Sequence, residues 1–403
     1  MGKLQDNVDE KIKDDDAFAV LEFSKQSSKR KRRLKSMALL IFNLLVIAII
    51  IIVEFTSNHE RVDITTVLKT WGENWYFLVA LFGLVAVYFL GMTARISLLI
   101  RATTGRPRRK LSFSTAVLGK YYDFITPFGS GGQPFQMFNL GRKLDVGLST
   151  SIPLADYIVH QLVFTVMAIV VFIINPEVMG GNTILIVAAY IGIVIFAGIP
   201  LAVIILSIFP KAIREPLRLL CRIGHKIRII KDLEKAEAKV INGVERYAGS
   251  MKAVSSKWRY LVLSALLSVI CWISYHALPY FVLRVCGVTA DFFDTVCMSI
   301  YIFAAIIVVP TPGGAGAAEG AFYAIFQSLT GGFLFWGTML WRFCIYYIVL
   351  ILGLSITVYQ YIHASRKEKR IAALAINQYA AHAEAGECLS EEDLPEIDES
   401  SNG

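Results

Sequence analysis

The sequence lacks the short motifs by which common catalytic and metal centres are recognised. It contains no HExxH, no P-loop and no GxSxG, and no two carboxylates have the spacing of an acid–base pair on a soluble element. Its six cysteines are scattered without a CxxC pair, so neither a disulfide framework nor a zinc site is predicted. We therefore predict no catalytic residue, no bound metal and no cofactor.

Charged residues are also scarce, because only 18% of the chain is charged whereas 55% is hydrophobic. With a mean hydropathy of +0.56, this is more apolar surface than a soluble domain could bury. The formal net charge of +8 does not indicate nucleic acid, because the basic residues flank long apolar runs. That distribution is explained by membrane topology and by anionic lipid headgroups.

Six apolar segments are long enough to cross a hydrocarbon core of about 30 Å. They are residues 37–55, 75–100, 152–174, 184–209, 260–283 and 333–362. The clusters of Lys and Arg between them predict that both termini lie in the cytoplasm. Residues 1–36 and 366–403 are interpreted as tails, the second with an acidic end. The basic insert 210–259 is expected to form amphipathic helices on the cytoplasmic headgroups.

Two Pro/Gly breaks interrupt shorter apolar segments and share a T-P-x-G-x-G pattern. The matching residues are Thr126, Pro127, Gly129 and Gly131 in the first break, and Thr311, Pro312, Gly314 and Gly316 in the second. Their offset is constant at 185 residues (311 − 126). We predict two re-entrant hairpins, 113–140 and 295–329, that enter from opposite sides and form an inverted-topology repeat. The alternative is that two Pro/Gly-rich turns match by chance.

The breaks are candidate ligand sites because a helix N-terminus inside a cavity presents unpaired N–H groups to an anion. Half-helices that begin at Gly131 and Gly316 could bind a phosphate, and the glycines let a ligand approach the backbone closely. The alternative is a packing kink at which glycines allow close helix contact. Glu319 follows the second break and Gln133 the first. Glu319 is predicted either to face a substrate amine or coupling proton, or to cap the broken helix.

Several other ionisable residues lie inside predicted membrane segments. Arg342 and Asp156 occupy nearly corresponding positions after the two breaks and could pair with each other, or Arg342 could bind a lipid phosphate. His160, one helical turn from Asp156, could join a proton relay or be a packed polar residue. We expect Arg95 and Lys120 to reach the cytoplasmic interface along their flexible stems. Asp123, beside the first break, is a weaker site candidate.

At these residues the chain resembles a known family. The segments TPFGSGGQPFQMF (126–138), PTPGGAGAAEGAF (310–322) and WRFCIYYIVLILG (341–353), with Asp156, are similar to the flippase-like transmembrane region of bacterial lysylphosphatidylglycerol synthases, the multiple peptide resistance factors. The resemblance covers about residues 37–365. Gln133 stands where many relatives are expected to have an acidic residue.

The resemblance implies a polytopic inner-membrane protein that moves a phospholipid, such as aminoacylated phosphatidylglycerol, from the inner to the outer leaflet. There the lipid lowers the negative surface charge and confers resistance to cationic peptides. In those relatives a C-terminal soluble domain makes the lipid from aminoacyl-tRNA. Because this chain ends about forty residues after its last predicted span, we expect that domain to be absent and a separate lipid synthase to be a partner.

The sequence thus predicts an all-α polytopic protein of the bacterial plasma membrane that acts as a phospholipid flippase. Its partners would be membrane phospholipids, anionic headgroups and further copies of the chain. The predicted substrate-binding residues are Thr126, Pro127, Gly129, Gly131, Gln133, Thr311, Pro312, Gly314, Gly316, Glu319 and Arg342, with Asp156 and His160 as a relay or ion pair. One alternative is a phosphatidylglycerol lysyltransferase or its accessory subunit. The other is a transporter of a small anion or a polyprenyl-linked substrate.

Overall fold

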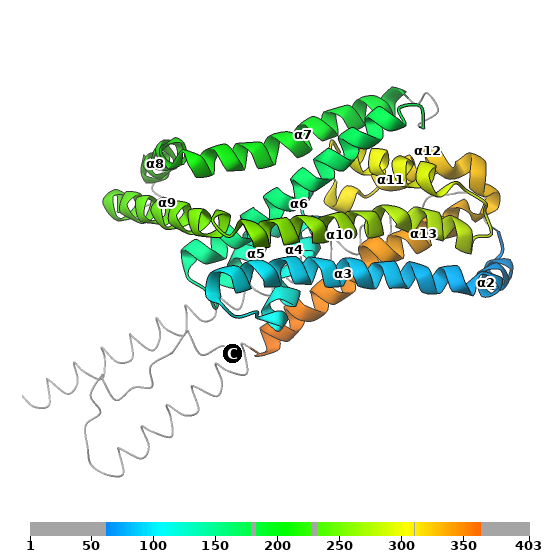
Figure 1. Ribbon diagram of the computed structural model, residues 1–403, viewed down its shortest axis with the longest axis horizontal. Helices are drawn as coiled ribbons and strands as arrows, with labels where there is room; N and C mark the ends of the chain where they lie inside the picture. Colours follow the sequence, from blue (N-terminus) through cyan, green and yellow to red (C-terminus); the bar gives the residue numbers. More distant parts are fainter. Residues whose placement is uncertain (1–61, 179–182, 227–231, 310, 364–403) are drawn as a thin grey trace, which may run out of the picture. The chain divides into compact units, whose positions relative to one another are not determined.

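The computed structural model describes residues 62–178, 183–226, 232–309 and 311–363, and this part of the chain contains helices and no strand (Figure 1). The α-helices are α2 (Ile64–Glu73), α3 (Trp75–Thr104), α4 (Arg109–Ile125), α5 (Gly132–Gly141), α6 (Val146–Ile174), α7 (Thr183–Ile208), α8 (Pro210–Lys226), α9 (Leu233–Ser255), α10 (Trp258–Val285), α11 (Phe292–Ile306), α12 (Ala317–Thr330) and α13 (Leu334–Arg342). After α13, one π-helical stretch (Phe343–Tyr347) leads into helix that continues to His363.

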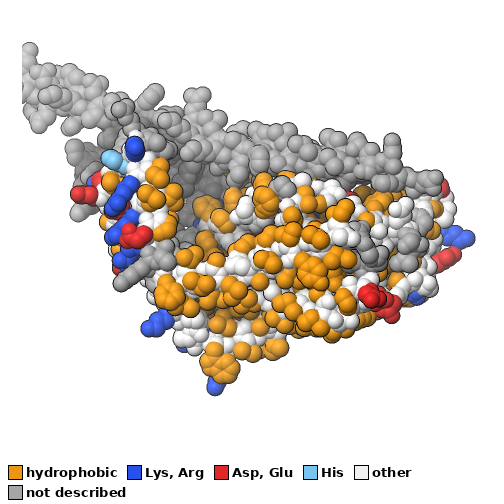
Figure 2. Space-filling view, turned by 90° about the horizontal axis from the view of Figure 1, so that it is seen from above, with side chains coloured by type: hydrophobic (Ala, Val, Ile, Leu, Met, Phe, Trp, Pro, Cys, Tyr) orange, Lys and Arg blue, Asp and Glu red, His pale blue; other side chains and the backbone are white. Residues whose placement is uncertain are grey.

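Five helices within the described ranges are long and apolar enough to cross a membrane. They are α3, α6, α7, α10 and the continuous helix Leu334–His363. Five of the six predicted spans are thereby confirmed, and the sixth, 37–55, lies outside the described residues, as do the tails 1–36 and 366–403. In Figure 2 hydrophobic side chains cover the middle of the visible face, whereas charged ones gather towards its two ends. The chain is an all-α polytopic membrane protein.

The start of α6 shows why apolar runs alone misplace helix ends. The sequence predicted a span from 152, where the apolar run begins, but α6 starts at Val146. Asp145 has extended backbone angles, and its side chain accepts a hydrogen bond from the Leu148 N–H at 3.1 Å. This N-cap satisfies one of the free N–H groups of the first turn. The cap therefore sets the helix start, before the residue at which the apolar run begins.

Both predicted hairpins are present, and their breaks have the same backbone geometry. In the first, α4 and α5 are joined by the short 3₁₀ turn Pro127–Gly129, and in the second, α11 and α12 by Pro312–Gly314. The central residue of each turn has positive φ, with φ 56° and ψ 16° at Phe128 and φ 60° and ψ 15° at Gly313. These two positions differ by the same 185 residues (313 − 128). The two turns also lie against each other.

Helix packing agrees with an inverted repeat. On the face between α4 and the last helix, Phe124 meets Tyr346 at a ring distance of 4.8 Å, and Tyr121 lies against Gly353. Residue numbers therefore rise along one helix as they fall along the other, so the two helices are antiparallel.

At the repeat offset of 185 residues, α4 corresponds to α11 and the last helix corresponds to α6. Helices α11 and α6 are also antiparallel. There Phe172 stacks on Tyr301 with ring centroids 3.8 Å apart, and Phe164 meets Phe303 at 4.9 Å. Two packing faces with matching direction and matching sequence offset are what two inverted copies of one unit would produce.

The basic insert 210–259 contains the helices α8 and α9, which pack against each other. Ion pairs join the two helices, from Arg214 to Glu245 at 3.0 Å and from Arg222 to Glu237 at 3.1 Å. Helix α9 buries Tyr247 and Val254 and packs against α6. One face of this pair is therefore held by protein, and its contact with headgroups stays a prediction.

Helices α7 and α11 approach closely at Gly192, where an added Cβ would clash with the backbone carbonyl of Ala304. We predict that Gly192→Ala lowers the stability of the fold by about 1–3 kcal/mol, because the two helices would have to separate. Gly198→Ala on the same helix is the matched control, since a Cβ there meets nothing within 4 Å. Thermal unfolding in detergent measures the difference. Equal melting temperatures for the two variants would contradict this packing.

Candidate functional site

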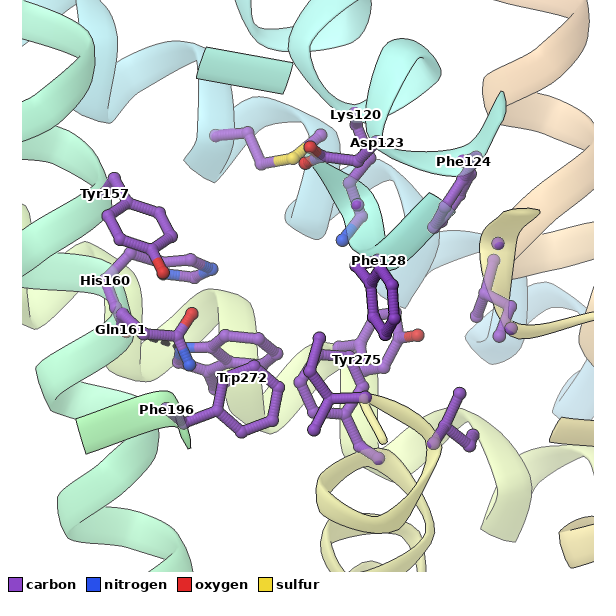
Figure 3. Close-up of a pocket in the computed structure, with 18 of the residues that line it drawn as sticks. Lys120, Asp123, Phe124, Phe128, Tyr157, His160, Gln161, Phe196, Trp272 and Tyr275 are labelled. Atoms are coloured by element: carbon purple, nitrogen blue, oxygen red, sulfur yellow. Dashed lines mark hydrogen bonds between the residues drawn. The ribbon is translucent and has the colours of Figure 1, made fainter. Parts of the chain in front are cut away.

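A cavity of about 540 Å³ lies between the two hairpins and helices α3, α6, α7 and α10 (Figure 3). Most of its wall is apolar and aromatic, with Trp272, Tyr275 and Phe196 among the lining side chains. Five ionisable side chains of Asp, Lys and Arg also line it, namely Arg95, Lys120, Asp123, Asp156 and Arg342. An apolar cavity with a few convergent polar groups is the usual form of a ligand site.

Arg95 and Asp156 form a buried, two-bonded ion pair that links α3 to α6. The Arg95 Nε donates to Asp156 Oδ1 at 3.0 Å, and its Nη2 donates to Oδ2 at 2.6 Å. The third nitrogen, Nη1, lies 2.7 Å from His160 Nδ1. Because arginine only donates, this ring nitrogen accepts. All three nitrogens of the guanidinium thus contact two residues that lie one turn apart on α6.

This pair corrects two expectations. Arg95 does not reach the cytoplasmic interface, because its partner Asp156 lies in the interior and only 3% of Arg95 is exposed. The pair of Asp156 with Arg342, which the sequence allows as one possibility, is not formed. Each residue has a nearer partner of opposite charge on another element.

Arg342 and Glu319 form the second ion pair, at the break of the second hairpin. Glu319 also accepts a hydrogen bond from the Gly316 N–H through Oε2 at 2.6 Å. Arg342 reaches the carbonyl oxygens of Gly313 and Gly314 at 3.4 and 3.5 Å. Of the roles considered for Glu319, this geometry provides the cap. The pair stabilises both the free N–H and the free C=O groups of the break.

The first break is capped in a similar way, by Asp123. Its Oδ1 accepts a hydrogen bond from the Gly132 N–H at 2.8 Å, at the start of α5. An added Cβ at Gly132 would collide with this carboxylate, so a larger residue there would displace the Asp123 side chain. The neighbouring N–H of Gly131 donates to Thr126 Oγ1 at 2.9 Å. The N–H groups of Gly131 and Gly316 were predicted to bind a phosphate. In the structure they donate to oxygens of the protein instead.

Lys120 lies one turn before Asp123 on α4, and it corrects a third expectation. Its ammonium does not extend to the interface but lines the cavity, 5.0 Å from the ring centre of Phe124 and 6.0 Å from that of Tyr275 (Figure 3). Sequence reasoning missed this role, because the direction in which Lys120 points depends on how α4 packs. It also missed Gln161, which lines the cavity from α6.

The predicted site residues divide into two groups. Those in the cavity wall are Gly129, Gln133, Thr311, Gly314, Arg342, Asp156 and His160. Those that shape the breaks without lining the cavity are Thr126, Pro127, Gly131, Pro312, Gly316 and Glu319. No group of three or more His, Cys, Asp or Glu side chains in the described ranges could hold a metal ion.

Comparison with known proteins gives one family. A family model described as the lysylphosphatidylglycerol synthase TM region matches residues 38–353. This range includes both hairpins and every residue of the cavity wall. No curated protein matches the chain.

The buried Arg95–Asp156 pair can be tested by a double-mutant cycle. We predict that Arg95→Met destabilises the fold by about 3–5 kcal/mol, because it leaves the Asp156 carboxylate buried without its cation. The double variant Arg95→Met/Asp156→Leu should recover most of that loss, because no unpaired charge remains. Unfolding in detergent measures all four proteins of the cycle. Additive losses in the double variant would mean that the two side chains do not depend on each other.

Proposed function

The chain belongs to the family of the lysylphosphatidylglycerol synthase TM region, and on that premise we propose that it is a flippase, which moves a phospholipid between the leaflets of a bacterial plasma membrane. The observation that carries the proposal is the cavity at the two hairpin breaks, because it places fixed charges inside an otherwise apolar wall. A polar headgroup would cross the hydrocarbon by binding there. Aminoacylated phosphatidylglycerol is one candidate substrate.

The surroundings of the cavity suit a lipid better than a soluble solute. Helix α7 contributes Ile199 to the wall, and this side chain is 48% exposed. Phe128, at the first break, also lines the cavity and is 56% exposed. Apolar side chains that border the cavity and remain accessible offer a path along which acyl chains could stay in the bilayer. We therefore propose that only the headgroup enters.

The inverted repeat suggests how access could alternate. In transporters built from inverted repeats, the site lies at the repeat interface, and one repeat rocks against the other. Here the turns Pro127–Gly129 and Pro312–Gly314 meet beside the cavity. Movement of one hairpin against the other would open the cavity first to one leaflet and then to the other. In this proposal both termini are cytoplasmic and transport runs from the inner to the outer leaflet.

Transport can be measured in proteoliposomes with leaflet-resolved fluorescent phosphatidylglycerol. We predict that the wild-type protein accelerates exchange between leaflets over protein-free vesicles. Arg342→Met and Glu319→Gln should each lower the rate at least about tenfold, because either change unpairs a charge at the second break. Arg259→Met is the matched control, since Arg259 is exposed at the start of α10.

Folding of each variant is checked by its melting temperature and by gel filtration. If folded wild-type protein accelerates no phospholipid, the flippase proposal is wrong, and uptake of inorganic phosphate or a polyprenyl phosphate by the same vesicles would favour the alternative transporter. If both variants fold and transport normally, the second break does not take part in transport.

A further inference from the structure

The two hairpins neutralise their capping carboxylates differently. Glu319 caps the second half-helix of its hairpin and is paired with Arg342. Asp123 caps the second half-helix of the first hairpin through Gly132, but within the described ranges no Lys, Arg or His nitrogen lies within 4.0 Å of its carboxylate. The repeat is therefore completed by a cation in one half only. Asp123 lines the cavity, where a ligand could supply the missing cation.

Lys120 is the complementary case, a cation that forms no close ion pair with an acid. In the part of the chain that the structure describes, no carboxylate oxygen lies within 4.0 Å of its ammonium, which instead faces two aromatic rings. Figure 3 shows Lys120 and Asp123 together on one turn of α4, at the same side of the cavity. Residues three apart on a helix are neighbours on its surface, with Cβ atoms about 5–6 Å apart.

The charges of the site sum to zero. The cations are Arg95, Lys120 and Arg342, and the carboxylates are Asp123, Asp156 and Glu319. Two of each sign are used by the internal ion pairs. One positive and one negative group remain for a ligand. A charge at membrane depth is costly without a partner, so a ligand that brings both opposite charges would be favoured over one that brings a single charge.

A third side chain points to the same kind of ligand. Gln161 lines the cavity from α6, is 6% exposed, and its amide nitrogen has no hydrogen-bond partner among the described residues. An unmatched buried donor is destabilising until an acceptor arrives. A phosphate has several acceptor oxygens and could accept from either of these donors, Lys120 on α4 or Gln161 on α6. An amine, in contrast, would need an acceptor, and Asp123 is the only one of these three side chains that offers a negatively charged acceptor.

We propose that Lys120 and Asp123 recognise a zwitterionic phospholipid headgroup, in which a short linker joins a phosphate to a primary amine. The Lys120 ammonium binds the phosphate, and the Asp123 carboxylate binds the amine. This assignment rests on the proposed function, for it names the headgroup class that the flippase selects. An anionic headgroup without an amine leaves Asp123 unpaired, and a headgroup with a second amine brings a positive charge that nothing left in the site neutralises.

Binding and transport together test the assignment. Native mass spectrometry of the purified full chain in detergent would compare short-chain phosphatidylethanolamine with phosphatidylglycerol. We expect the wild-type protein to prefer the ethanolamine lipid by about tenfold, the scale of one hydrogen bond to a charged group. Asp123→Asn should remove that preference and leave binding of phosphatidylglycerol at least as tight. Lys120→Met should weaken binding of both lipids about tenfold.

Two matched variants control for general effects of charge. Lys110→Met makes the same change as Lys120→Met at an exposed position of α4. Asp145→Asn makes the same change as Asp123→Asn at the N-cap of α6, outside the cavity wall, and asparagine is also a good N-cap. Both controls should bind like the wild type. Asn at position 123 can still accept from Gly132, so the first break should remain capped.

The outcomes separate this inference from the flippase proposal. A wild-type protein without preference for the amine lipid overturns the inference, and this comparison requires no variant to fold. An unchanged preference in folded Asp123→Asn overturns it as well. If the amine lipid binds with the expected preference but vesicle assays show no movement of any lipid, the flippase proposal fails and the headgroup site stands. If lipids move without headgroup preference, only the headgroup assignment fails.

Discussion

A helix that breaks inside the hydrocarbon must find partners for its free backbone groups within the protein, and this constraint organises the site. The chain meets it with carboxylates, Asp123 at the first break and Glu319 at the second. Each carboxylate satisfies an N–H group and suits the partial positive charge of a helix N-terminus. It also brings a negative charge to membrane depth. At the second break Arg342 lies beside Glu319 and neutralises that charge.

The two halves of the repeat reach neutrality through different pairs. By the repeat offset, Asp156 corresponds to position 341 (156 + 185), next to Arg342, so an acid in one half stands almost where a base stands in the other. Asp156 is neutralised by Arg95 on α3, and Arg342 by Glu319 on α12. This divergence between similar halves leaves Lys120 and Asp123 outside the internal pairs. If both hairpins paired their capping carboxylates with cations of the protein, no such charged groups would remain for a ligand.

The sequence could predict the features that depend on local composition. Apolar length located five described spans, and the repeated Pro/Gly pattern located both breaks to within a few residues. The sequence could not predict the ion pairs, because Arg95 and Asp156 are 61 residues apart. A buried charge indicates that a partner exists, but it does not identify the partner residue. The sequence likewise predicts an interfacial position for Lys120, whereas the structure places it in the cavity wall. The packing of α4 directs its side chain, and no local pattern records that packing.

Tyr346 connects the two breaks and gives them a physical means of acting together. Its ring packs against Phe124, and its hydroxyl donates to the Phe124 carbonyl at 3.4 Å, just before the first break. The same ring lies so close to Gly313 that a Cβ there would overlap it. Gly313 also has a φ of 60°, which glycine adopts without strain. Because one rigid ring touches both hairpins, a shift of either hairpin must displace it or carry the other along.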